Sequence, residues 1–119
     1  MILIYGNPVS RKIWASFSDA ERADGLRYYA AFTESLAESG ELIVSEALAD
    51  PSLTRRVPAS SADLVTDVAL AEAKEQLAGF FLVECADMER ALAIAARVPE
   101  AAHGLVEVRP VMTYDMPDL

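Results

Sequence analysis

Apolar residues in this chain follow two patterns, and the first predicts the centre of a sheet. Phe80-Phe81-Leu82-Val83 comes directly after a charged segment and Gly79, and it favours a strand that is apolar on both alternating faces. Met1 to Tyr5 has the same two-sided character. Strands of this kind need cover on both sides. The pattern therefore predicts helices on one face of a sheet and a second copy of the chain on the other.

Other segments read as shorter strands separated by turns. Val106 to Val111 alternates clearly, so Val106 and Val108 should face the helices. The polar link 58–63 joins two weaker strands and makes a hairpin between them. The full set of expected strands is Met1–Tyr5, Leu42–Leu48, Leu53–Val57, Leu64–Thr66, Phe80–Cys85 and Val106–Val111.

The second pattern has helical spacing and predicts two main helices. Ser18 and Glu21 have the spacing of a capping box, and Gly40 suits the left-handed position after a helix from Asp19 to Ser39. Asp87 can cap a second helix, which Pro99 closes. The faces expected to pack on the sheet are Leu26, Tyr29, Phe32 and Leu36 in the first helix, and Met88, Ala91, Leu92 and Ala95 in the second.

Two segments fit these patterns less well. The stretch that holds Trp14 and Phe17 is expected to be an irregular lead-in or a short helical turn. Asp67 to Leu77 is rich in Ala, Glu, Lys and Leu, which predicts a partly helical segment.

The element order β-α-β-β-α-β, with an extra hairpin in the middle, predicts one α+β domain over residues 1–119. Two helices should lie on one face of an antiparallel sheet. Residues 113–119 are expected to form a loosely held tail.

Composition narrows the classes of partner. The chain has 10 Lys and Arg against 19 Asp and Glu, a net charge of −9. This balance argues against nucleic acid and against anionic membrane surfaces. Cys85 is the single cysteine, so no intrachain disulfide can form, which fits a cytoplasmic protein. Neither a signal peptide nor an apolar run of membrane-spanning length is visible.

Glu107 and Arg109 are the leading candidates for a binding site. They stand two residues apart on a strand and share the face that lies away from the helices. There Arg109 can hold an anionic group in a bidentate manner. The alternative is an ion pair between them at a subunit interface.

Further candidates lie elsewhere in the chain. Lys74 and Tyr5 can line a ligand pocket, and Asp67 or Glu75 can act as a general base. The alternatives are a helix cap at Asp67, a solvated charged face beyond it and packing for Tyr5. His103 can transfer a proton, or it is a surface loop histidine.

The sequence shows no motif that is typical of a cofactor site. It has no glycine-rich phosphate loop and no cluster of residues with metal-ligand spacing. Neither a metal nor another cofactor is therefore expected.

Several short motifs, in this order, give the chain a family resemblance. They are Leu3-Ile4-Tyr5-Gly6, Phe32-Thr33-Glu34 followed by Gly40, Val65-Thr66-Asp67, Lys74-Glu75-Gln76-Leu77 before Gly79, and Val106-Glu107-Val108-Arg109-Pro110-Val111. With them the chain resembles the YCII-related proteins of the DGPF type. The resemblance implies a ferredoxin-like fold and a dimeric α+β barrel. It implies no reaction, and it suggests a connection of some members with alternative sigma factors.

Two positions depart from this resemblance. The Asp-Gly-Pro-Phe turn of the family is replaced by Asp67-Val68-Ala69-Leu70, so only Asp67 carries over. The YCII proteins proper are thought to pair a His with an Asp, and the positions nearest to these are Tyr29 and Val98. That dyad is absent here, and its acid–base role is not carried over.

The sequence thus supports two functional hypotheses and leaves open whether the protein is an enzyme. The first is a homodimer that binds a small, anionic organic molecule in a cleft between the sheet and the partner subunit. The second is a non-catalytic regulatory or interaction module, linked to sigma-factor regulation, in which the same charged residues serve the dimer seam.

Overall fold

The fold is built on a four-stranded antiparallel sheet with the strand order β2-β5-β1-β6. The computed structural model describes residues 1–59, 66–67 and 75–114, and for 66–67 only the backbone. The sheet strands are β1 (Ile2–Gly6), β2 (Leu42–Ala47), β5 (Gln76–Val83) and β6 (Val106–Val108). A separate two-stranded hairpin pairs β3 (Arg55–Arg56) with β4 (Thr66–Asp67).

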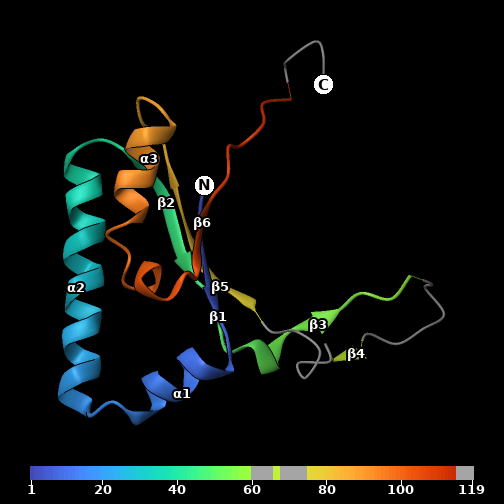
Figure 1. Ribbon diagram of the computed structural model, residues 1–119. Coiled ribbons are helices and arrows are strands. Elements are labelled where there is room, and N and C mark those ends of the chain that lie inside the picture. Colours follow the sequence, from blue (N-terminus) through green and yellow to red (C-terminus); the bar gives the residue numbers. More distant parts are fainter. Residues whose placement is uncertain (60–65, 68–74, 115–119) are drawn as a thin grey trace.

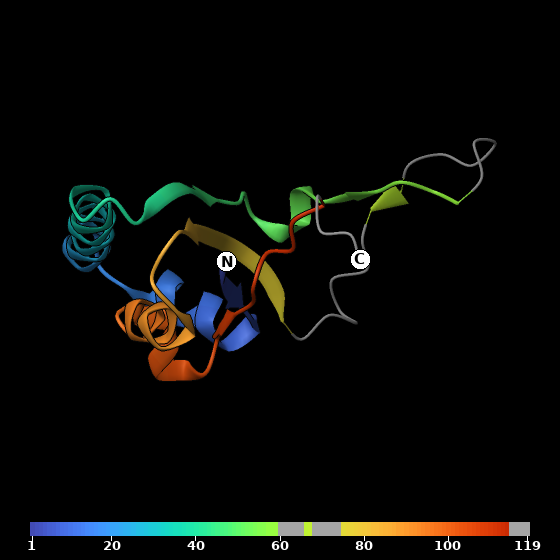
Figure 2. The same ribbon diagram turned by 90° about the horizontal axis from the view of Figure 1, so that it is seen from above.

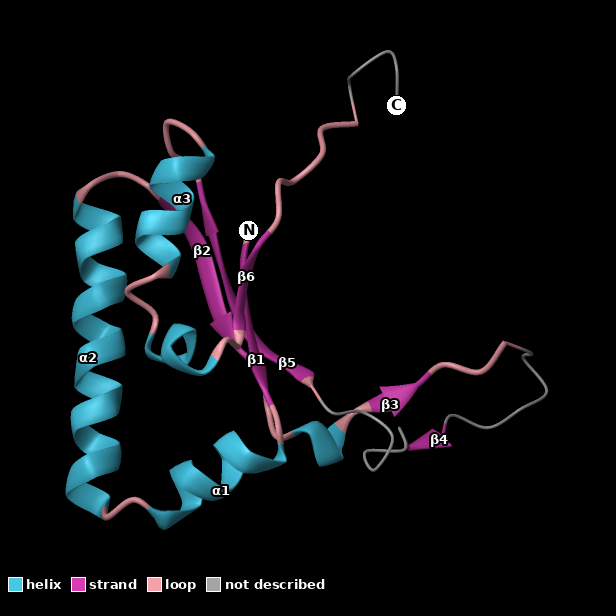
Figure 3. Cartoon of the chain, in the orientation of Figure 1, coloured by secondary structure: helices cyan, strands magenta, loops and turns pink. Residues whose placement is uncertain are grey.

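Helices α2 (Asp19–Glu38) and α3 (Met88–Ala95) lie on one side of the four-stranded sheet (Figures 1 and 2). Helix α1 (Pro8–Ser16) follows β1, and the described residues also form the short 3-10 helices η1 (Pro51–Leu53), next to the hairpin, and η3 (Pro99–His103). The helix layer and the sheet are distinguished by colour in Figure 3. This order and sheet topology confirm the predicted ferredoxin-like α+β fold.

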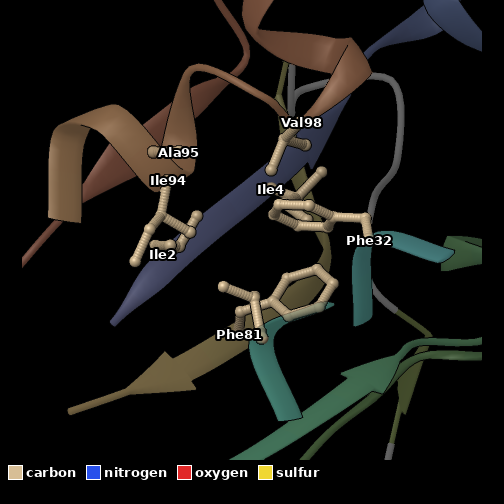
Figure 4. Close-up of a cluster of buried hydrophobic side chains, with 8 residues drawn as sticks. Ile2, Ile4, Phe32, Phe81, Ile94, Ala95 and Val98 are labelled. Carbon is tan, nitrogen blue, oxygen red and sulfur yellow. The ribbon is translucent and has the colours of Figure 1, made fainter. Parts of the chain in front are cut away.

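The core lies between α2, α3 and the sheet, and Phe81 of β5 is at its centre (Figure 4). The Phe32 ring of α2 meets Phe81 edge to face, with centroids 5.2 Å apart. The Tyr29 ring of the same helix stacks on Phe81, with centroids 6.5 Å apart. Ile2 stands directly opposite Phe81 on β1 and is fully buried. Aromatic and aliphatic burial of this kind is the main term that stabilises a domain of this size.

Local sequence signals set the ends of α2 as predicted. The Ser18 side chain accepts a hydrogen bond from the Glu21 amide, and the Glu21 carboxylate accepts one from the Ser18 amide. Gly40 has φ = 79°, and the Glu41 amide donates to the Leu36 carbonyl. A residue with a Cβ would be strained in this left-handed position, which explains why glycine ends the helix.

The prediction for the segment around Trp14 was too cautious, because it forms the regular helix α1. Asn7 and Ser10 make a reciprocal capping box, and Pro8 occupies the first helical position, where its missing amide costs nothing. Trp14 lies beside Gly25 of α2, 43% exposed.

The prediction for Asp67 to Leu77 was wrong at both ends. Asp67 pairs with Arg55 in β4, and Gln76 and Leu77 belong to β5, where they pair with Gly6 and Tyr5. Pairing with β1 therefore overrides the helix propensity of this segment, and Asp67 is not a helix cap. Residues 68–74, which include the rest of the predicted helix, lie outside the described part of the chain. The predicted hairpin is confirmed by the β3–β4 pair.

The predicted helix faces were correct in part. Phe32 and Leu36 are buried, but Leu26 is 64% exposed. In α3 the buried side chains are those of Ala91, Ile94 and Ala95, whereas Leu92 is 52% exposed. Ala91, Ile94 and Ala95 thus form the buried face of α3, and Met88 and Leu92 lie towards solvent.

Strand β6 confirms the predicted alternation but is shorter than expected. Val106 and Val108 pack against the core, and Glu107 and Arg109 are exposed. The last pairing with β1 is made by Arg109, whose amide donates to the Met1 carbonyl at 2.9 Å. Pro110 has no amide hydrogen to continue the ladder, so the strand ends there. Val111 to Tyr114 are exposed, and residues 115–119 lie outside the described part.

A two-point ion pair ties the start of β2 to α3. Arg90 donates to both carboxylate oxygens of Glu41, at 2.9 and 2.8 Å, and Ser39 donates to the same carboxylate at 2.8 Å. The Glu41 side chain is only 15% exposed. The hydrogen bonds from Arg90, with that from Ser39, lower the pKa of Glu41 to about 2.

Within the described residues, no helix combines the length and the apolar character needed to cross a bilayer.

We predict that Gly79→Ala destabilises the protein, because a Cβ at this position would lie 2.8 Å from the Glu46 carbonyl oxygen of β2. The strand backbone would have to shift, at a cost of about 1–3 kcal/mol of unfolding free energy. Gly25→Ala in α2 is the matched control, since its Cβ would meet only the Trp14 ring at 3.4 Å. That change should be neutral or stabilise by up to about 1 kcal/mol. Urea melts followed by circular dichroism measure both, and equal effects would refute the close approach.

We predict that Arg90→Ala lowers stability near neutral pH and that this loss disappears in acid. The pKa of Glu41 is lower in the folded protein than its ordinary value of 4.5, so the pair stabilises the fold above that value. The contribution is lost as the pH falls from 4.5 towards 2. Arg27→Ala, which removes an exposed pair with Asp24, is the control and should change Tm less. A Tm deficit of Arg90→Ala that is independent of pH would contradict this account.

Candidate functional site

The sheet face opposite the helices is apolar in the middle and acidic at both edges. The strand register places Glu46 of β2, Phe80 of β5, Leu3 of β1 and Glu107 of β6 in one row across all four strands. Directly opposed residues of antiparallel strands project to the same face. Phe81, next to Phe80, points to the core, so this row lies on the other side. We call it the open face, because neither α2 nor α3 covers it.

Tyr5 and Glu107 form the centre of the candidate site on the open face. The Tyr5 hydroxyl donates a hydrogen bond to the Glu107 carboxylate. This bond, together with partial burial and the negative charges of Glu107 and Glu75, raises the pKa of Tyr5. Tyr5 is therefore a neutral hydrogen-bond donor at physiological pH, and the Glu107 carboxylate keeps lone pairs for a second donor.

Arg109 brings a positive charge to this centre. The positive charge of Arg109 lowers the pKa of Tyr5. This effect is smaller than the effects of Glu107, Glu75 and burial, which raise it. The backbone fixes its position, since the Arg109 amide and carbonyl both bond to Met1, at 2.9 and 2.7 Å. The side chain is exposed, and no carboxylate of the described residues forms an ion pair with it. Within the single chain Glu107 bonds to Tyr5, and the alternative of an ion pair at a subunit interface stays a prediction.

Glu75 joins the same neighbourhood from the start of β5. It is exposed, and its charge acts on the Tyr5 hydroxyl. The structure thus brings together Tyr5, Glu75, Glu107 and Arg109, four of the residues singled out from the sequence. Lys74, the residue before Glu75, lies outside the described part of the chain.

Two candidate bases stand apart from this centre. Asp67 belongs to the hairpin, which projects away from the four-stranded sheet (Figure 1). His103 is exposed at the end of η3, on the side of the helices. The charge of His103 is not among those that act on Tyr5. A proton-transfer role for either residue stays a prediction.

A second polar pair, between α2 and η3, was missed by the sequence analysis. Tyr29 donates to the Glu100 carboxylate, and burial followed by this bond raises its pKa. Next to it the Tyr28 hydroxyl donates to the Arg97 carbonyl at 2.6 Å. The helical spacing predicted Tyr29 as a residue that packs on the sheet. Such spacing does not indicate which group accepts the hydrogen bond of its hydroxyl. Val98, the other position compared with the family dyad, is buried in the core.

The described residues hold no group of three or more His, Cys, Asp or Glu side chains arranged for a metal ion. Cys85 is half-buried at the end of β5, and its thiol lies 3.5 Å from the Asp87 carbonyl. The chemistry that the open face offers is therefore ionic and hydrogen-bonding. It consists of one guanidinium, a neutral phenol and carboxylates beside an apolar surface.

This arrangement can recognise a molecule that carries both an acidic group and a hydrogen-bond donor. Arg109 suits a carboxylate or phosphate through its paired N–H groups. Glu107 lies two residues before Arg109 on the chain. Its carboxylate can accept a hydrogen bond from a hydroxyl or amine of the same ligand. Phe80 and Leu3 lie beside these groups and can contact an apolar portion.

Comparison with known proteins identifies the family of the chain. A model of the YCII-related domain matches residues 1–115, nearly the whole chain. A curated relative from Rhizobium meliloti (strain 1021), named "Uncharacterized protein R00369", is 31% identical over 116 residues. The match covers 95% of this chain and 91% of the relative. The chain belongs to the YCII-related family.

Proposed function

We propose that this protein is a cytoplasmic homodimer that binds a small anionic organic molecule between the open face and the partner subunit. Arg109 anchors the acidic group, Glu107 and Tyr5 hold a polar group, and Lys74 adds a second positive charge. The observation that carries this proposal is Arg109. It is an exposed guanidinium without an ion-pair partner in the described residues, and it lies beside a tyrosine–glutamate pair.

Dimer formation is supported by the apolar residues of the open face. Leu3, Phe80 and Leu82 are half-buried although the helices do not cover them, and Val44 of β2 is 39% exposed. Removing such a surface from water is favourable by about 25 cal/mol per Å². A second open face, brought up by a two-fold axis, presents the same apolar middle.

A second candidate function is a non-catalytic interaction module. The observation that favours it is the bond between Tyr5 and Glu107, which already satisfies part of the site without a ligand. In this case Arg109 pairs with a carboxylate across the dimer seam. The link with sigma-factor regulation suggested by the family resemblance would belong to this function. Catalysis by Asp67, Glu75 or His103 is not part of either proposal.

We predict that the protein is a dimer and that Phe80→Glu makes it monomeric, because a charge would be buried in the middle of the interface. Light scattering across a dilution series should give twice the chain mass of 12.9 kDa for the wild type. The control is Leu92→Glu, which changes an exposed apolar residue on the outer side of α3 and should stay dimeric. A well-folded wild-type monomer at micromolar concentration would rule out the proposed dimer.

We predict that Arg109→Ala abolishes ligand binding with little loss of stability. Thermal-shift measurements with a panel of small carboxylates and organic phosphates, on wild type and variant, provide the test. Arg27→Ala, an exposed arginine on α2, is the control and should respond like the wild type. If the protein is instead an interaction module, Arg109→Ala would leave a carboxylate at the dimer interface without its ion-pair partner. This would lower the free energy of unfolding by about 3–5 kcal/mol. Unchanged stability together with an unchanged ligand response would exclude both functions for Arg109.

A further inference from the structure

The hairpin extends away from the rest of the chain. We call residues 53–59 together with β4 the arm. Figures 1 and 2 show β3 and β4 on the side opposite α2 and α3, extending outward beyond the sheet. Leu53 and Val57, on either side of β3, are 67% and 81% exposed. The arm therefore presents apolar surface that its own chain does not cover.

The two arginines of the arm have different neighbours across the hairpin. Arg55 stands opposite Asp67, whereas Arg56 stands opposite the neutral Thr66. Adjacent residues of a strand project to opposite faces, so Arg56 points away from the face of Arg55. Arg56 is exposed and forms no ion pair with a described residue. It is a cation in a chain with a net charge of −9.

The open face has the complementary charge. Among the described residues, it carries Glu75 and Glu107 near Tyr5 beside the cation Arg109, and Glu46 adds a carboxylate at the other edge. Two such faces brought together would repel each other, because like charges at an interface cost free energy. A dimer that closes through the open face therefore needs cations from elsewhere.

We propose that the arm of each chain crosses to the other subunit and places Arg56 against the second copy's Glu75 and Glu107. This inference rests on the dimer proposed above. Each candidate site then contains a residue from both chains, and a monomer holds an incomplete site. Leu53 and Val57 cover apolar surface of the other subunit in the same contact.

Disulfide trapping between two different chains tests this arrangement. In a Cys85→Ala background, one chain carries Arg56→Cys and the other carries Glu75→Cys. The two proteins are mixed and left to exchange subunits, and mild oxidation should then link one chain of each kind. The matched control replaces Glu75→Cys with Glu34→Cys, an exposed glutamate on α2. The control pair should not link, because α2 lies on the opposite side of the sheet from the arm.

The outcomes separate this inference from the proposed dimer. Linked heterodimers with Glu75→Cys and none with Glu34→Cys support the crossing arm. A protein that is dimeric by light scattering but yields no such link, or links equally with the control, overturns the arm and leaves the dimer standing. A wild-type monomer overturns both.

Charge reversal gives a second measurement that does not require oxidation. Arg56→Glu should raise the dissociation constant of the dimer by about tenfold or more, since it places a like charge against Glu75 and Glu107. Glu75→Arg in the same chain should restore most of the affinity. Because Arg56 is exposed on the arm, neither change removes a core contact. An unaltered dissociation constant for Arg56→Glu would refute the contact.

Discussion

The helix layer of this protein depends on the packing of Phe81. Its ring contacts Phe32 and Tyr29 of α2, and Ile2, which stands opposite it on β1, is fully buried. The guanidinium of Arg97 lies 4.9 Å above the Phe32 ring and continues this aromatic stack towards the end of α3. Because Phe80 is next to Phe81, the same strand register also sets the open face. A shift of one residue would exchange the two faces along the whole of β5.

Much of the fold could be predicted from short-range signals. The capping box at Ser18, the left-handed Gly40 and the alternation of Val106 and Val108 each depend on neighbouring residues, and the structure confirms all three. The predictions were wrong where contacts with residues distant in the sequence determine the local structure. Gln76 and Leu77 have helix-forming surroundings but join β5 because Tyr5 and Gly6 offer a strand edge. Leu92 lies towards solvent, whereas Ala91 and Ala95 are buried.

The candidate site was predictable only as a set of residues. Alternation along β6 placed Glu107 and Arg109 on one face, and the structure agrees. The bond from Tyr5 to Glu107 depends on the pairing of β1 with β6, whose strands are separated by about a hundred residues of sequence. No local pattern reveals such a register. In the single chain Glu107 accepts a hydrogen bond from Tyr5, and an ion pair of Arg109 across a subunit interface stays a prediction.

The position of Trp14 has a practical consequence for spectroscopy. It is the single tryptophan of the chain, and it lies at the corner between α1 and α2, against Gly25 and 5.7 Å from the Phe17 ring. Tryptophan fluorescence, excited selectively, therefore reports the docking of α1 on α2. A change in emission without a change in backbone signal would mean that this corner opens while the sheet stays folded.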